Sequence, residues 1–152
     1  MDRAYHKQAL RRATVLLALA LGSSGITAVT AGAAAAATVE VRVSGVTPGR
    51  GKVNVAVCDK EHFLKDCAYS GSAPANAAET VVKIDSVPAG TWAVLAYQDE
   101  NQNNKLDRNL LGIPSENYGF SRAARGKFGP PGFTDAAIEV QQETVVAPIT
   151  LR

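Results

Sequence analysis

The sequence predicts an all-β fold, a small antiparallel β-sandwich of about seven strands with one long ordered loop after a core strand. Short segments alternate between apolar and polar side chains, as half-buried strands do. Gly and Pro turns separate these segments, and none from Thr38 on has a convincing helical period. The chain of 152 residues has room for about one domain, so we expect a single sandwich over residues 38–152.

The first 37 residues are expected to be a cleaved signal peptide rather than part of the domain. Four basic residues precede an apolar run at residues 15–21, and a tract of small residues follows. This order is typical of secretory signals, and Ala-x-Ala sites place cleavage near residues 35–37. The apolar run is far shorter than the roughly 20 residues that span a bilayer. We therefore expect an exported protein, periplasmic or secreted, with no membrane span after cleavage.

Removal of this leader leaves a chain that is close to neutral. The whole sequence has 16 Lys and Arg against 14 Asp and Glu, a formal net charge of +2. Four of the bases and one of the acids lie in the leader, which leaves 12 bases and 13 acids. The charge therefore gives no support for nucleic-acid binding. We expect the partner to be an envelope protein, a peptide or a glycan.

The two cysteines, Cys58 and Cys67, are expected to form a disulfide bond. An exported chain meets an oxidising compartment, where a disulfide is the usual state of a cysteine pair. The alternative is a metal or redox pair, but the spacing is not C-x-x-C and His62 is the one other soft ligand nearby. Closing so short a loop contributes roughly 2–3 kcal/mol in a chain-entropy treatment.

The strands are expected in the following order. The segments "TVEVRVSG" (38–45) and "KVNVAVCD" (52–59) alternate with period two, and "VTPGRGK" between them is typical of a hairpin connection. The segments "ETVVKIDSV" and "TWAVLAYQD" follow, joined by the tight turn "PAG". The last two, "DAAIEVQ" and "ETVVAPITLR", suggest a final hairpin, in which Pro148 requires an edge strand or a bulge.

Residues 100–134 match neither a strand nor a helix, and we expect an ordered loop that caps the sandwich. Structureless segments of this length are uncommon in compact domains and are usually functional or disordered. Disorder is disfavoured because the segment carries too many apolar side chains for a solvated tail. These side chains are Leu106, Leu110, Leu111, Ile113, Tyr118, Phe120, Phe128 and Phe133.

The second half of this segment holds the most specific motifs. They are YGFS at 118–121, RG at 125–126, GPP at 129–131 and F-DA at 133–136. Together with the preceding "VPAGTWAVLAYQDEN", they resemble the signature of the bacterial domain-of-unknown-function family 2141, over about residues 39–151. The resemblance implies an exported protein and no established activity. The pattern PAG-T-W-x-V is also similar to a strand pair in transthyretin-like and carboxypeptidase-regulatory-like sandwiches, which implies a fold and not a function.

The stretch "DENQNNKLD" is a candidate calcium loop. Calcium loops often place oxygen ligands at positions 1, 3, 5, 7 and 9, with a backbone carbonyl at position 7. Leu110 stands at position 12, where a bidentate Glu is expected, and Asx-turns that merely knit the loop are the alternative interpretation. The candidate ligands are Asp99, Asn101, Asn103, the carbonyl of Lys105 and Asp107, with Glu116 as a further candidate if the loop folds back.

A second candidate site combines aromatic and basic side chains. Tyr118, Phe120 and Phe128 could stack on a carbohydrate or peptide while Arg125 binds a carboxylate or phosphate. The alternative is that the aromatic rings anchor the long loop to the sheet, since its ordering entropy must be offset, and that the cations face water.

No residue pattern identifies a catalytic site. His62 is the one histidine outside the leader, and no G-x-S-x-G motif is present. We therefore expect a non-enzymatic binding or scaffolding module of the periplasm or cell envelope. The alternatives are a hydrolase of envelope polymers that uses Asp99, Asp107 or Glu116 as acids, and a purely structural envelope component that pairs through edge strands.

Overall fold

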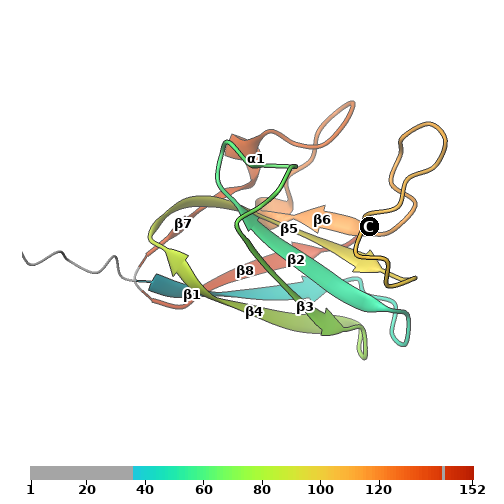
Figure 1. Ribbon diagram of the computed structural model, residues 1–152, viewed down its shortest axis with the longest axis horizontal. Coiled ribbons are helices and arrows are strands. Elements are labelled where there is room, and N and C mark those ends of the chain that lie inside the picture. Colours follow the sequence, from blue (N-terminus) through green and yellow to red (C-terminus); the bar gives the residue numbers. More distant parts are fainter. Residues whose placement is uncertain (1–35, 142) are drawn as a thin grey trace, which may run out of the picture. The chain divides into compact units, whose positions relative to one another are not determined.

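Residues 36–141 and 143–152 are described by the computed structural model, and they form two β-sheets that pack against each other (Figure 1). The predicted signal peptide lies outside these residues apart from its last two positions. The first strand begins at Ala36, two residues before the expected start of the domain. Within the described residues, no helix is long and apolar enough to cross a membrane.

The two sheets contain eight strands, which confirms the all-β prediction. The smaller sheet has the order β4–β1–β8 and the larger has the order β3–β2–β5–β6, with β7 pairing beside β6 along β5. The strands are β1 (Ala36–Ser44), β2 (Lys52–Cys58), β3 (Tyr69–Pro74), β4 (Glu79–Pro88), β5 (Gly90–Asp99), β6 (Tyr118–Phe120), β7 (Ala137–Val140) and β8 (Val145–Thr150). Two short helical pieces, η1 (Ser121–Ala123) and α1 (Phe133–Ala136), connect β6 to β7.

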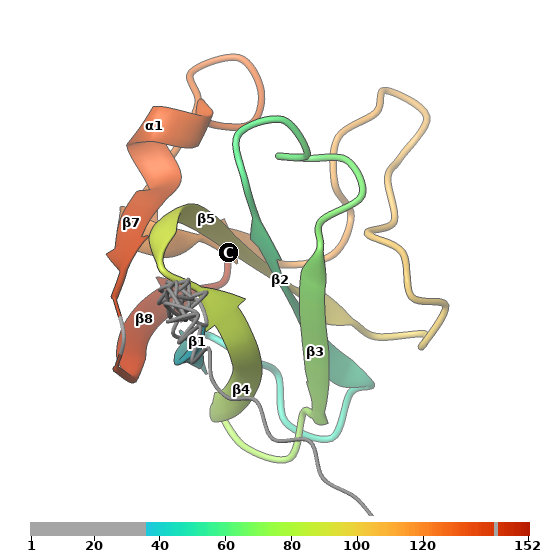
Figure 2. The ribbon, with the colours of Figure 1, turned by 60° about the vertical axis from the view of Figure 1, so that its left-hand side comes forward.

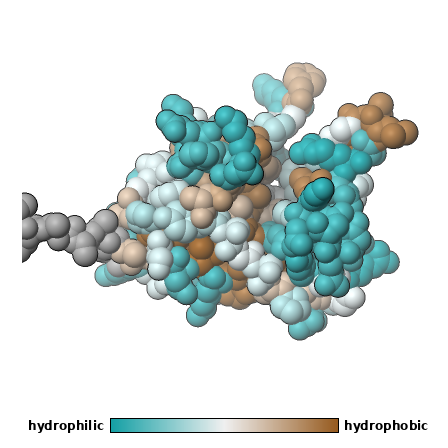
Figure 3. Space-filling view, in the orientation of Figure 1, coloured by the Kyte–Doolittle hydropathy of each residue, from teal (hydrophilic) through white to brown (hydrophobic). Residues whose placement is uncertain are grey.

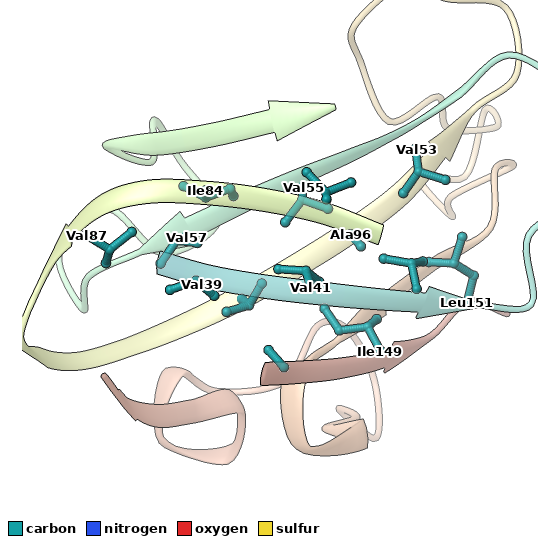
Figure 4. Close-up of a cluster of buried hydrophobic side chains, with 14 of the residues drawn as sticks. Val39, Val41, Val53, Val55, Val57, Ile84, Val87, Ala96, Ile149 and Leu151 are labelled. Carbon is teal, nitrogen blue, oxygen red and sulfur yellow. The ribbon is translucent and has the colours of Figure 1, made fainter. Parts of the chain in front are cut away.

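Valine side chains from both sheets fill the space between them (Figure 4). Successive side chains of a strand point to opposite faces, so every second residue of an alternating segment is buried. Val39, Val41 and Val43 of β1 have no exposed surface, and Val53 and Val57 of β2 face them from the larger sheet. Each such side chain contributes about 1.5–3 kcal/mol when it is fully buried.

Two predicted hairpins are wrong, because the chain crosses between the sheets at both places. β1 belongs to the smaller sheet and β2 to the larger one. β7 pairs with β5, whereas β8 pairs with β1 in parallel, the one exception to antiparallel pairing in the described part of the chain. The alternation of apolar and polar residues shows that a strand buries one face. It does not show which sheet the strand joins, because both sheets bury one face. The edge position predicted for Pro148 is confirmed, since β8 borders the smaller sheet.

The predicted disulfide is confirmed and closes the loop after β2. The Cys58 and Cys67 sulfur atoms are bonded, with their Cα atoms 4.6 Å apart. Strand β3 follows this loop and was not expected, because "YSGSAP" carries Ser, Gly and Pro instead of alternating apolar residues. Its backbone pairs with β2 at the edge of the larger sheet, where a half-exposed strand needs few apolar side chains.

Candidate functional site

Three loops project from the larger sheet on the same side and border a groove (Figure 1, Figure 2). They are the disulfide loop (59–68), the loop of residues 100–117, and the loop of residues 124–132, here called the proline loop. The floor of the groove includes Leu95 and Tyr97, on the face of β5 that points away from the core. The groove has a volume of about 600 Å³, and its lining is mainly apolar.

Tyr97 adds a polar group to this floor. Burial raises the pKa of its hydroxyl above the ordinary value; a hydrogen bond with Asn54 lowers the pKa in part, and the nearby carboxylate of Asp99 raises it. The phenol is therefore neutral near pH 7 and able to donate a hydrogen bond to a ligand.

Aromatic rings at one end of the groove hold the loops against the outer face of β5. Phe120 is buried and lies 6.0 Å, between ring centroids, from both Phe63 of the disulfide loop and Tyr118. Phe63 also contacts Phe133 edge-to-face at 5.8 Å. Phe120 therefore anchors the loops, and both Phe120 and the half-buried Tyr118 line the groove.

Residues 107–115, here called the tip hairpin, hold two leucines away from the protein surface. Asn109 closes the turn, because its Oδ1 accepts the amides of Leu111 and Ile113 at 2.9 and 3.0 Å. Leu110 and Leu111 at the tip have relative exposures of 106% and 83%. An ordered turn therefore presents these leucines to solvent, which differs from the expected packing of the apolar residues over the sandwich.

The proline loop presents a third exposed apolar side chain, Phe128, with a relative exposure of 104%. The turn is tight. A Cβ placed on Gly126 would lie only 2.2 Å from the Gly129 carbonyl oxygen, so this position requires glycine. Pro130 and Pro131 stiffen the chain that follows. Arg125 lies in the same loop but lines a smaller adjoining pocket together with Tyr118 and Phe120.

The candidate calcium loop closes around the buried carboxylate of Asp99. Its Oδ1 accepts the amide of Asn103 at 3.0 Å, and its Oδ2 accepts the amide of Asn104 at 2.8 Å. Asn54 of β2 donates to the same Oδ2 at 3.1 Å, and Lys52 lies 3.9 Å from it. Asp99 has no exposed surface, so its role in the structure is to fix the first turn of the loop.

The other predicted ligands also converge, held by hydrogen bonds among themselves. Asp107 accepts the side-chain amides of Asn101 and Asn103 at 2.6 and 3.0 Å. Glu116 does fold back, and its two oxygens accept the amides of Glu100 and Asp107 at 3.0 Å. In the described part of the chain, no group of three His, Cys, Asp or Glu residues is arranged to hold a metal ion. A calcium ion here would depend on Asn oxygens, and the site stays a prediction.

The sequence matches one known protein family. Residues 41–147 match the family model described as "Uncharacterized protein conserved in bacteria (DUF2141)". The chain belongs to this family. The matched residues of this DUF2141 domain include the candidate calcium loop, the tip hairpin and the proline loop. Searches of curated proteins and of solved structures found no match, and the likeness to transthyretin-like sandwiches stays a prediction.

Neither the groove of this DUF2141 domain nor the polar residues that brace it were predicted from the sequence. The buried Oγ of Ser121 accepts the Val94 amide at 3.0 Å and donates to the Ala136 carbonyl, which ties the start of η1 to β5 and α1. Gln98, fully buried, bonds the loop between β1 and β2. The available signal was a polar residue at an inward position of an alternating strand, since such a residue needs a buried partner.

Proposed function

We propose that this protein is an exported, non-enzymatic binding module whose ligand lies in the groove between the tip hairpin and the proline loop. One observation carries the proposal. Two ordered loops beside an apolar groove of about 600 Å³ present bulky apolar side chains that are almost fully exposed to water. Monomeric soluble proteins rarely expose large contiguous apolar patches, and those that do occur commonly mark binding sites.

The lining indicates an amphipathic ligand with an apolar body and an anionic group. Leu106, Leu111 and Ile113 line one wall of the groove, and Phe128 lines the other. Arg108 and Lys127 lie among these residues and are exposed. An apolar body would be buried between the walls, while a carboxylate, sulfate or phosphate would bind the cations at the rim.

The disulfide supports export, because such bonds persist in oxidising compartments.

The hydrogen bonding and burial of the loop carboxylates favour a binding function over hydrolysis. Asp99 is fully buried, and the carboxylates of Asp107 and Glu116 accept hydrogen bonds from groups of their own loop. A general acid or base must reach a substrate, so these carboxylates are better placed to fix the loop than to catalyse.

The groove can be tested with 8-anilinonaphthalene-1-sulfonate, an apolar dye that carries one anionic group. We expect its fluorescence to rise on binding to the wild type, and the affinity to fall about tenfold or more in a Leu106→Gln, Ile113→Gln variant, because about 1.4 kcal/mol of lost contact is a factor of ten. Both side chains line the groove. Fluorescence titration measures the affinities.

A Val81→Gln, Val146→Gln variant is the matched control, since both valines are about half exposed on the smaller sheet. It should bind the dye like the wild type. Equal affinity of the groove variant and the wild type would refute the proposed site, provided that the circular dichroism spectra of the variants agree.

A calcium ion in the Asp99–Asp107 loop is a separate proposal. The Asx-turn oxygens of Asn101 and Asn103 each accept one amide, which leaves a second lone pair for a cation. If calcium binds the native state alone, the melting temperature must rise with its concentration. We expect an upward shift in millimolar Ca²⁺ relative to EDTA, measured by calorimetry on the oxidised protein, and no shift in an Asp107→Ala variant.

Asp107 is preferable to Asp99 for this test because its partners are side chains rather than the backbone that closes the loop. Magnesium at the same concentration controls for ionic strength. If the melting temperature of the wild type is the same in calcium, magnesium and EDTA, the loop does not bind calcium, and its Asx-turns serve only to stabilise its conformation.

A further inference from the structure

We propose that the amphipathic ligand is phospholipid, and that Leu110, Leu111 and Phe128, here called the loop tips, dock the domain on the surface of an anionic bilayer. This inference rests on the proposed function and names the source of its ligand. Three observations support it: the exposure of the tips, the hydrogen bonding of the turn that bears the leucines, and the charge of the surrounding segments.

The loop tips are exposed to a degree that no other large apolar side chain of the described chain reaches. Their relative exposures are 106%, 83% and 104%, whereas Leu64, Val81 and Val146 lie between 43% and 48% and Ile113 reaches 56%. The space-filling view shows two brown tips standing out from a largely teal and white surface (Figure 3). Convex apolar projections fit a fluid lipid surface, which deforms around them, better than they fit a rigid partner.

The tip hairpin can enter an apolar layer with several of its backbone groups already hydrogen-bonded within the turn. Groups in such a layer lose their hydrogen bonds to water, and each unsatisfied amide then opposes insertion. The amides of Leu111 and Ile113 donate to the Asn109 side chain, and the amide of Gly112 donates to the Asn109 carbonyl at 2.9 Å. Arg108 donates to the Gly112 carbonyl at 2.9 Å. The amides of Leu111, Gly112 and Ile113 and the carbonyl of Gly112 thus have partners within the turn before it meets the membrane.

The charge of the two loops complements an anionic surface. Residues 107–134 contain Arg108, Arg122, Arg125 and Lys127 and two acidic residues, Asp107 and Glu116, whose carboxylates accept hydrogen bonds within the loop. The rest of the chain after residue 37 holds the other eight bases and the other 11 acids, so this segment is net positive while the rest is net negative. Each basic residue near an anionic bilayer strengthens partitioning about fivefold, within a Debye length of the surface.

The tips and the charges act on the same side of the molecule. The tip hairpin and the proline loop project together in both ribbon views (Figure 1, Figure 2), and residues of both line one groove. On a bilayer, the leucines and Phe128 would lie among the upper acyl segments while Arg125 and Lys127 remain at the phosphates. The groove between them would then face the lipid headgroups.

Vesicle co-sedimentation of the oxidised full-length protein tests this inference. One set of vesicles is phosphatidylcholine alone, and the other contains phosphatidylglycerol as well. We expect the wild type to bind the anionic vesicles, more weakly as salt increases. A Leu110→Gln, Phe128→Gln variant should lose about tenfold or more in partitioning on both sets. An Arg125→Gln, Lys127→Gln variant should lose about 30-fold on the anionic vesicles and little on the neutral ones.

The Val81→Gln, Val146→Gln variant should sediment like the wild type. If the wild type stays in solution with anionic vesicles but still binds the dye, the membrane inference fails and the proposed function stands. If neither vesicles nor dye bind, both fail. Analytical ultracentrifugation decides the remaining case: a dimer that dissociates in the Leu110→Gln, Phe128→Gln variant would assign the tips to a second copy of the chain and overturn membrane docking.

Discussion

An Asp99→Ala substitution is expected to lower the free energy of unfolding by about 3 kcal/mol, because it removes a buried acceptor from several donors. Asp99 has no exposed surface and accepts the amides of Asn103 and Asn104 at 3.0 and 2.8 Å. Asn54 would also lose its acceptor, and Lys52 its nearest carboxylate. Water can replace part of these bonds on the exposed side of the loop, which limits the loss.

Urea unfolding in EDTA measures this effect without any contribution from calcium. Asp107→Ala is the control, because Asp107 is half-exposed and its hydrogen-bond donors, the side chains of Asn101 and Asn103, can turn to solvent. We expect the control to lose less than about 1 kcal/mol. Equal losses in the two variants would contradict the view that Asp99 is the residue around which the loop folds.

A Gln98→Ala substitution is expected to lower the free energy of unfolding by about 2–4 kcal/mol, through a cavity and lost hydrogen bonds. Gln98 is fully buried. Its Oε1 accepts the Thr47 amide at 2.9 Å, and its Nε2 donates to the carbonyls of Thr47 and Arg50 at 2.8 and 2.7 Å. One side chain of β5 thereby holds the loop that carries the chain from one sheet to the other.

Amide hydrogen exchange localises this second effect. In the variant, the Thr47 amide should exchange much faster, whereas amides of the β1 core should accelerate only as far as global stability falls. Gln141→Ala, at an exposed glutamine, is the control and should leave both unchanged. Unaltered protection of Thr47 in Gln98→Ala would show that the backbone of the β1–β2 loop is held by other contacts.

Local pattern was enough to predict the strands that form the core. Val39, Val41 and Val43 alternate with polar residues, and such a segment can bury its valines only by presenting one face to another layer. The disulfide was likewise predicted from the expected oxidising compartment and the short spacing of Cys58 and Cys67. In both cases the physical reason lies within about ten residues of the chain.

What the sequence could not predict depends on partners that are distant along the chain. Nothing within β8 indicates that it pairs with β1, because Val145 and Ala147 would be buried equally well against either sheet. The prediction that Leu110 packs against the sandwich failed for a local reason. Apolar content indicates burial on average, but here the Asn109 side chain closes a turn that holds the leucine in solvent. That outcome depends on a local hydrogen bond that composition does not reveal.

The parallel pairing of β1 with β8 also sets the order in which the domain can be assembled. The first strand, β1, lies between β4 and β8. Its pairing with β8 therefore requires residues more than one hundred positions later in the chain, as in the hydrogen bond between the Ser44 and Thr150 side chains. Backbone hydrogen bonds between Tyr118 and Arg152 then join β6 of the larger sheet to the segment that follows β8. During synthesis from the amino terminus, one edge of β1 would therefore stay unpaired until β8 has been made, so the smaller sheet can be completed only late in folding.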